Sequence, residues 1–203
     1  MTLPRLLLVT DRHRMRPSFE GALEAALRGG ARLVQLREKD LAPREVFPLA
    51  LQAQRLTERY GAKLIINSRA DIARAAHADG VHLPENDIAP AAARLSLSQY
   101  SLCGASVHSV ETARRASDEG ADYVVFGPVL ATASHPATSP AGIQRLSEAV
   151  RAVACPVYAI GGINATAARQ CREAGAYGVA VISTVWEADD IAGAVRELNG
   201  VIG

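Results

Sequence analysis

Two cations separated by one residue stand in the run Gln35-Leu36-Arg37-Glu38-Lys39-Asp40. At the end of a strand, Arg37 and Lys39 project from the same face and can bind one anion together, Arg as a bidentate fork and Lys as a point charge. An exposed ion pair with Glu38 or Asp40 accounts for the same pattern equally well. The run therefore indicates either an anion site or a surface salt bridge.

A second pattern indicates phosphate binding. Gly161-Gly162 follows one apolar run, and Ser183-Thr184 follows the next. Glycine lets backbone N–H groups approach phosphate oxygens closely, and a hydroxyl adds another donor. Paired glycines also occur in plain turns between a strand and a helix. In barrels of eight β/α units the last two loops often bind phosphate, and this favours the phosphate interpretation if the chain has that fold.

Titratable side chains supply a third set of candidates. His82, His108 and His135 fall near the ends of apolar runs, and imidazole titrates close to neutrality, as a proton-transfer group requires. Each of them alone is more often a hydrogen-bonded structural residue. Asp87 is the carboxylate that we assign to Mg²⁺, which completes its shell with phosphate oxygens and water. A single Asp in a polar loop also serves as a cap or turn residue.

Short apolar runs must position these residues. Most of the runs are continuously hydrophobic, as parallel strands buried on both faces are. The predicted strands are Arg5–Thr10, Arg32–Arg37, Lys63–Asn67, Gly80–Leu83, Leu102–Val107, Tyr123–Phe126, Pro156–Ile160 and Gly178–Ile182. Segments with helical periodicity lie between them: Phe19–Arg28, Pro43–Arg59, Ala70–His77, Val110–Glu119, Ile143–Val153, Ala165–Glu173 and Ile191–Leu198. Ser18 and Asn164 are expected N-caps, and Pro43 suits a first helical turn.

The repeating strand–helix pattern predicts a single (β/α)8 TIM barrel of the α/β class. Dividing 203 residues by eight strands gives about 25 residues per unit, close to the minimum for a compact barrel. An open doubly wound sheet usually has fewer strands, and no GxGxxG motif follows the first strand. Because no linker or change in composition divides the chain, we expect residues 1–203 to form one domain. The active site of such a barrel lies at the C-terminal ends of its strands.

Composition excludes several classes of protein. Lys and Arg total 22 against 21 for Asp and Glu, so there is no basic footprint for nucleic acid. No apolar run approaches the roughly 18 residues that cross a bilayer, and the start of the chain does not resemble a signal peptide. Cys103, Cys155 and Cys171 are odd in number and widely spaced, as reduced thiols are. We therefore expect a cytoplasmic protein that binds neither nucleic acid nor membranes.

An ordered set of motifs resembles one family, that of thiamine-phosphate synthase and its relative, the thiazole tautomerase TenI. The motifs are Gln35-Leu36-Arg37-Glu38-Lys39, Ile66-Asn67, Asp79-Gly80-Val81-His82-Leu83, Gly104-Ala105-Ser106-Val107-His108, Gly120-Ala121-Asp122-Tyr123, Gly127-Pro128-Val129 with Thr132, Ile160-Gly161-Gly162-Ile163 and Gly178-Val179-Ala180-Val181. No single motif is specific, but their order along nearly the whole chain is.

The resemblance implies a barrel that joins a hydroxymethylpyrimidine pyrophosphate to a thiazole phosphate, with Mg²⁺ assisting the departure of pyrophosphate. It implies that the pyrimidine pyrophosphate is held by Gln35, Arg37, Lys39 and Asn67, with Ser106 beside it. It implies that Asp87 binds Mg²⁺ and that the thiazole phosphate is held by Thr132, Ser134, Gly162, Ile182 and Ser183, to which the glycine pattern adds Gly161. His135 stands where the family has a lysine near the pyrophosphate, and we count it with Arg37, Lys39 and Ser106 as catalytic.

Some positions depart from the synthase pattern. Ser68 replaces an aspartate that also binds Mg²⁺, and Pro84-Glu85 replaces Gly-Gln. The segment Ser106–Ser109 is closer to the tautomerase, yet Pro128 stands where the catalytic histidine of that branch is expected. A tautomerase with this sequence would need another base, either His108 or His135. A non-catalytic protein that binds thiazole phosphate is the third interpretation.

Two further expectations concern assembly and closure. Trp186 and the terminal helix offer apolar residues for a homodimer. The other expected partners are phosphorylated small molecules, as substrates. The segment Ala131–Ala141 has loop composition, with two prolines and several hydroxyl residues, and is a candidate lid over the substrate.

Overall fold

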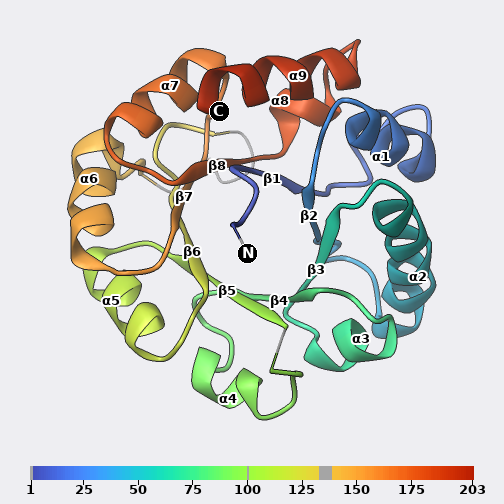
Figure 1. Ribbon diagram of the computed structural model, residues 1–203, viewed down its shortest axis with the longest axis horizontal. Helices are drawn as coiled ribbons and strands as arrows, with labels where there is room; N and C mark the ends of the chain where they lie inside the picture. The colour runs from blue at the N-terminus through green and yellow to red at the C-terminus, as the bar shows by residue number, and fades with distance from the viewer. Residues whose placement is uncertain (1, 100, 133–138) are drawn as a thin grey trace.

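Eight parallel strands close into a barrel in the computed structural model, which describes residues 2–99, 101–132 and 139–203. Each strand pairs with the next in chain order, and β1 pairs with β8 through Leu8 and Val181. This arrangement confirms the predicted (β/α)8 barrel, and Figure 1 shows the helices as an outer ring. The strands are β1 (Leu6–Val9), β2 (Leu33–Leu36), β3 (Lys63–Asn67), β4 (Gly80–Leu83), β5 (Leu102–Val107), β6 (Tyr123–Phe126), β7 (Val157–Ile160) and β8 (Gly178–Val181).

Helices follow the strands in chain order. They are α1 (Phe19–Arg28), α2 (Pro43–Arg59), α3 (Ala70–Ala75), α4 (Pro90–Arg94), α5 (Val110–Asp118), α6 (Gly142–Ala152), α7 (Ala165–Glu173), α8 (Ser183–Trp186) and α9 (Ile191–Ile202). The caps agree with expectation, since Ser18 Oγ accepts from the Gly21 amide at 3.1 Å and Asn164 Oδ1 accepts from the Ala167 amide at 2.9 Å. The sequence did not predict α4 and α8, because one turn of helix is too short to show a period.

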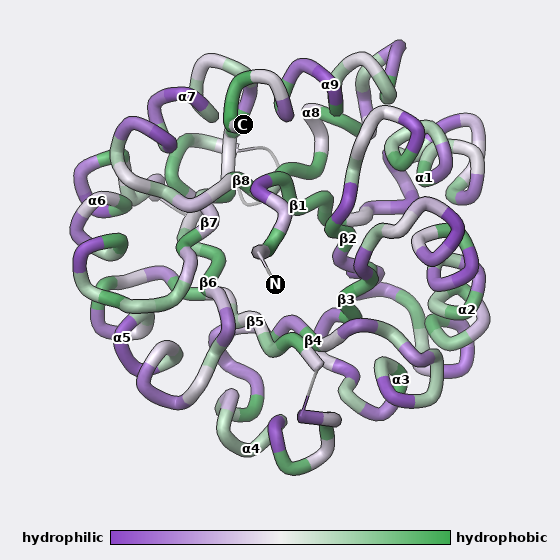
Figure 2. The backbone as a smooth tube through the Cα atoms, in the orientation of Figure 1, coloured by the Kyte–Doolittle hydropathy of each residue, from purple (hydrophilic) through white to green (hydrophobic). Residues whose placement is uncertain are grey.

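Two apolar layers build the core. The outer layer fills the space between the strands and the helices, and it includes Leu8 and Leu64. The inner layer lies within the barrel and consists of Leu7, Val9, Leu33, Ile65, Tyr123, Val125, Tyr158 and Ala180. Figure 2 shows stretches of hydrophobic colour on barrel strands such as β1, β3, β4 and β8, and alternating colours along the outer helices. Continuous apolar strands are therefore explained by burial on both faces.

The expectation for Trp186 was wrong. Its side chain is 1% exposed, and its indole Nε1 donates to the Val9 carbonyl oxygen at 2.7 Å. A large apolar ring behind a barrel strand is favourable only if its N–H has a partner, and Val9 supplies one. The terminal helix α9 likewise buries Val195 and Leu198 against the barrel. A homodimer stays a prediction, but Trp186 does not contribute an exposed patch to it.

The N-terminal end of the barrel is closed by aromatic residues and by the start of the chain. Figure 1 shows the N-terminus near the barrel axis. The Tyr158 hydroxyl donates to the Pro4 carbonyl, and the Tyr177 hydroxyl donates to the Leu3 carbonyl. The Tyr158 and Tyr177 rings meet edge to face, with their centroids 5.5 Å apart. These contacts pack the start of the chain against the N-terminal end of the barrel.

Among the described residues, no helix is both long enough and apolar enough to cross a bilayer.

Candidate active site

A cavity of about 330 Å³ opens at the C-terminal ends of the strands. It brings together these predicted site residues: Gln35, Arg37, Lys39, Asn67, Ser106, Thr132, Gly161, Gly162, Ile182 and Ser183. Two other predicted residues, Ser134 and His135, lie outside the described residues, as does most of the predicted lid. Asp87 is described but does not line this cavity. Glu85, Asn86 and Thr184, which stand in the polar runs after β4 and β8, line it as well.

Arg37 and Lys39 are free of salt bridges on this side of the barrel. Within the described parts of the chain, neither side chain makes a hydrogen bond or an ion pair, so the surface salt-bridge interpretation was wrong. Burial lowers the pKa of both groups, and the Arg37 charge lowers that of Lys39 further. Asp11 and Glu38 act on Arg37 only through their charge, and two neighbouring cations with no direct ion pair among the described residues favour the binding of an anion.

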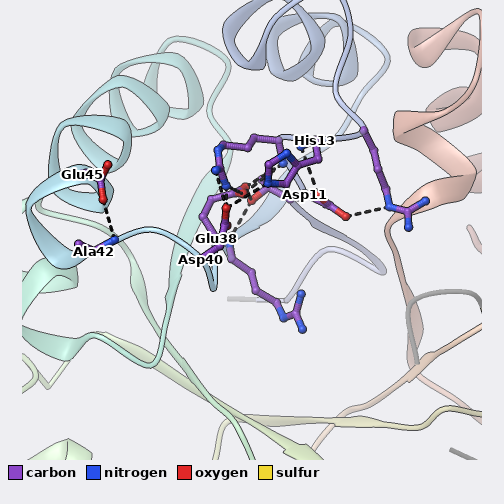
Figure 3. A network of polar contacts seen from close by, with 10 residues as sticks. Asp11, His13, Glu38, Asp40, Ala42 and Glu45 are labelled. Atoms are coloured by element: carbon purple, nitrogen blue, oxygen red, sulfur yellow. Dashed lines mark hydrogen bonds and ion pairs between the residues drawn. The ribbon is translucent and has the colours of Figure 1, made fainter. Parts of the chain in front are cut away.

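Glu38 and Asp40 bind Arg12 instead. Figure 3 shows this network between the loop after β1 and the end of β2. The Arg12 guanidinium lies 3.3 Å from Glu38 Oε2 and 2.5 Å from Asp40 Oδ2. Glu38 has a side chain that is only 2% exposed. The network takes up both acidic residues of the β2 run, and this leaves Arg37 and Lys39 available to a ligand.

Glu38 also positions the backbone of Arg37 through Thr10. The Thr10 hydroxyl donates to Glu38 Oε1 at 2.6 Å and accepts from the Arg37 amide at 3.0 Å. The Arg12 amide donates to both Glu38 oxygens at 3.2 Å. These bonds fix the start of the loop from which Arg37 and Lys39 project. Sequence reasoning missed Thr10 and Glu38, because a Glu between two cations has the pattern of an exposed ion pair.

Gln35 and Asn67 present polar groups to the same cavity. Gln35 Nε2 donates to Asn67 Oδ1 at 3.0 Å, and this bond orients both amides. Gln35 Oε1 and Asn67 Nδ2 keep no protein partner within the described residues. They are therefore one acceptor and one donor that a flat heterocycle with ring nitrogens and an amino group can use.

The glycine loop after β7 is shaped by a close approach of two chain segments. Gly161 and Gly162 have φ of 98° and 65°, and a Cβ on Gly162 would lie 2.5 Å from the Ala131 carbonyl oxygen. Glycine is thus required by packing against the loop after β6, whether or not a ligand binds. That packing places the loop carrying Thr132 beside Ser183, the first residue of α8.

A carboxylate and an imidazole meet on the cavity wall. His108 Nε2 lies 3.5 Å from Glu85 Oε2, and the His108 amide donates to Glu85 Oε1 at 3.3 Å. His108 Nδ1 is 2.5 Å from the Gly127 carbonyl oxygen, to which it donates, since a carbonyl only accepts. The imidazole edge at Nε2 therefore faces a carboxylate, an arrangement of the kind that general acid–base catalysis uses. Pro128, where the tautomerase histidine was expected, also lines the cavity.

Asp87 lies beside the end of β3. Its Oδ2 accepts a short hydrogen bond from the Ser68 hydroxyl, and its Oδ1 accepts from the Ile88 amide at 2.8 Å. Within the described residues, no group of three or more His, Cys, Asp or Glu side chains could hold a metal ion. Mg²⁺ needs only one or two protein carboxylates when phosphate oxygens and water fill its other positions. Asp87 offers one such carboxylate, but it does not line the cavity and both its oxygens already accept hydrogen bonds, so its binding of Mg²⁺ stays a prediction.

Comparisons with known proteins point to one family. A family model described as thiamine monophosphate synthase matches residues 6–185. A protein of Aquifex aeolicus named putative thiamine-phosphate synthase 2 is 45% identical over 187 residues, covering 92% of this chain and 100% of that protein. The thiamine-phosphate synthase of Chloroflexus aurantiacus is 42% identical and covers 98% of this chain and 92% of its own length.

Solved structures agree with the sequence comparison. The thiamine phosphate pyrophosphorylase of Pyrococcus furiosus superposes with a TM-score of 0.88 at 36% identity, over 98% of this chain and 95% of that one. A 3-hexulose-6-phosphate synthase superposes with a TM-score of 0.76 at only 18% identity, which shows a shared fold and nothing more.

Proposed function

The chain belongs to the thiamine monophosphate synthase family, whose members are transferases, and we propose that it makes thiamine phosphate from two phosphorylated substrates. In this reaction the bond between the pyrimidine methylene carbon and the pyrophosphate oxygen breaks, and a bond from the thiazole nitrogen to that carbon forms. The products are thiamine phosphate and pyrophosphate. The observation that carries the proposal is that one cavity combines two cations, which have no ion-pair partner among the described residues, with a separate glycine and hydroxyl loop.

The pyrimidine pyrophosphate is assigned to the β2 and β3 side of the cavity. Arg37 and Lys39 would bind the pyrophosphate, and the free amide groups of Gln35 and Asn67 would bind the pyrimidine. Cations that stabilise the departing pyrophosphate more strongly than the bound substrate lower the barrier to bond cleavage. Ser106 would add a hydrogen bond to this group.

The thiazole phosphate is assigned to the opposite set of loops. Gly161 and Gly162 would allow close backbone contact with its phosphate, and Thr132 and Ser183 would add hydroxyl donors. Holding this substrate in place makes the attack of its nitrogen effectively intramolecular. Asp87 would hold a Mg²⁺ ion that comes with the pyrophosphate, and the ion would neutralise charge on the leaving group.

Ligand selectivity tests this assignment. We expect Arg37→Gln to weaken the binding of inorganic pyrophosphate by at least tenfold in calorimetry while leaving thiazole phosphate binding within about twofold of wild type. Ser183→Ala should have the reverse selectivity. Equal weakening of both ligands by both variants would contradict two separate subsites. Binding is measured with and without EDTA to separate the contribution of Mg²⁺.

The pair of Glu85 and His108 favours a second candidate, an isomerase that moves a proton within a thiazole phosphate. That reaction needs one acid–base group and neither a pyrophosphate site nor Mg²⁺. If the chain is an isomerase, it will interconvert thiazole phosphate tautomers without any pyrimidine substrate, and His108→Asn will abolish that activity. Binding of thiazole phosphate with neither activity would identify a non-catalytic binder.

A further inference from the structure

Three polar side chains from neighbouring strands form a chain beneath the cavity. His82 on β4 lies between Ser106 on β5 and Tyr123 on β6: its Nε2 is 2.9 Å from Ser106 Oγ, and its Nδ1 is 3.3 Å from the Tyr123 hydroxyl. His82 is 2% exposed and Tyr123 is fully buried. Ser106 and the edge of His82 line the cavity, whereas Tyr123 does not. This chain of hydrogen bonds thus connects the buried interior of the barrel to the cavity.

A glycine on the intervening strand makes this chain possible. Gly104 on β5 pairs with His82 on one side and with Tyr123 on the other. A Cβ at Gly104 would lie 2.2 Å from Tyr123 Cζ and 2.5 Å from its hydroxyl oxygen. The phenol ring therefore occupies the space that a side chain on β5 would fill, and it reaches across to stack on His82, with ring centroids 5.6 Å apart.

The number of available protons fixes the direction of donation along these hydrogen bonds. The Tyr123 hydroxyl carries one proton, and His82 Nδ1 is its only hydrogen-bond partner among the described residues. The opposite direction would leave that proton buried without an acceptor, at a cost of about 1–3 kcal/mol. His82 Nδ1 therefore accepts, and the remaining ring proton on Nε2 is donated to Ser106 Oγ. The Ser106 oxygen is then an acceptor within the protein, and its own proton is free to point into the cavity.

The charge states of the buried groups agree with this direction. Burial lowers the pKa of His82 to about 3, with the Arg37 charge as a smaller cause, so the imidazole is neutral and carries a single N–H. Burial also raises the pKa of Tyr123 well above the usual range for a phenol, so the hydroxyl keeps its proton. An imidazolium would have two N–H groups and could not accept from Tyr123.

We propose that Tyr123 and His82 are positioning residues that fix the Ser106 hydroxyl as a hydrogen-bond donor to an anionic oxygen in the cavity. Arg37 and Lys39 line the same cavity, and the ligand oxygen is thereby expected to carry negative charge. The identity of that oxygen as one of a departing pyrophosphate rests on the proposed function. The direction of the hydrogen-bond chain does not, because it follows from buried contacts alone.

The tautomer of His82 tests the chain without reference to any activity. In protein labelled with ¹⁵N-histidine, we expect the His82 ring to be neutral, with its proton on Nε2, at neutral pH. The signal is assigned by its disappearance in His82→Gln. Tyr123→Phe removes the hydroxyl and should shift the ring nitrogen resonances. Tyr158→Phe removes a hydroxyl that bonds to the Pro4 carbonyl and not to His82, and it should not shift them. A proton on Nδ1, or no shift in Tyr123→Phe, would overturn the proposal.

Kinetics of the synthase reaction then test the link to Ser106. Tyr123→Phe should lower kcat about tenfold, as expected for the loss of one oriented hydrogen bond, with Tyr158→Phe close to wild type. Because Tyr123 acts through Ser106, adding Tyr123→Phe to Ser106→Ala should cause no further loss. Multiplicative losses in the double variant would refute the positioning role. If the protein makes no thiamine phosphate, the proposed function fails, while the tautomer measurement still decides the hydrogen-bond chain.

Discussion

Glu38 and Asp40 bind the same arginine, and we expect very different consequences from removing each of them. Asp40 makes the closer ion pair with Arg12, at 2.5 Å against 3.3 Å, but its side chain is 53% exposed and that of Glu38 is 2% exposed. Water and mobile ions weaken the exposed pair. Burial, and not distance, should therefore decide which carboxylate stabilises the fold.

The magnitude follows from the bonds that Glu38 accepts. Glu38→Gln keeps the shape and the bond from the Thr10 hydroxyl, but turns an amide N–H₂ toward the backbone and side-chain donors of Arg12. Loss of these charge-assisted bonds in a buried site should cost about 2–4 kcal/mol in the free energy of unfolding. For a chain of this length that is a fall in Tm of roughly 4–16 °C.

Thermal and urea unfolding of three proteins measure this effect: wild type, Glu38→Gln and, as the matched control, Asp40→Asn. We expect Asp40→Asn to unfold at the wild-type midpoint within error and Glu38→Gln to unfold well below it. Because the Arg37 amide depends on Thr10, which Glu38 holds, the Glu38 variant should also bind pyrophosphate more weakly. Equal midpoints for the two variants, or a lower one for Asp40→Asn, would refute the reasoning from burial.

Three other results are expected. Lys39 must be charged to bind an anion, and burial lowers its pKa. In a pH–rate profile, kcat/KM should therefore fall with rising pH at a pH below the usual lysine range. Lys39→Arg should move this fall to higher pH. Burial lowers the pKa of His82 to about 3 in the folded protein, whereas the unfolded chain keeps an ordinary value. As pH falls between these two values, the free energy of unfolding should decrease by up to about 1.4 kcal/mol per pH unit. Urea titrations of His82→Gln should show a smaller decrease over the same pH range. Gly162 has positive φ, and an added Cβ would lie 2.5 Å from the Ala131 carbonyl oxygen, whereas Gly61 has a similar φ with open space around it. Gly162→Ala should therefore lower Tm by more than Gly61→Ala. Equal losses would show that the contact with Ala131 relaxes freely.

The barrel was predictable from the sequence, because each buried parallel strand is a continuous apolar run and its helix has a clear period. The position of the site followed from that fold, since polar residues at strand ends meet at one rim. Arg37, Asn67, Ser106 and Ser183 therefore line one cavity, as predicted. Even so, sequence reasoning left open whether Arg37 binds an anion or a neighbouring acid.

What the sequence could not provide is the pairing of side chains across strands. Arg12 lies some two dozen residues before Glu38, and nothing in either motif indicates that they meet. The contact between His82 and Tyr123 depends on the missing side chain of Gly104, which a pattern of apolar residues does not register. The burial of Trp186 was not predictable, because its partner, the Val9 carbonyl, lies at the other end of the chain.

Product formation is the direct test of the proposed synthase reaction. The purified protein is incubated with hydroxymethylpyrimidine pyrophosphate, thiazole phosphate and Mg²⁺, and thiamine phosphate is measured by mass spectrometry over time. We expect many turnovers per protein molecule, none when either substrate is omitted, and a loss of at least tenfold in Arg37→Gln. Binding of both substrates by the wild-type protein without any thiamine phosphate would contradict the proposed reaction.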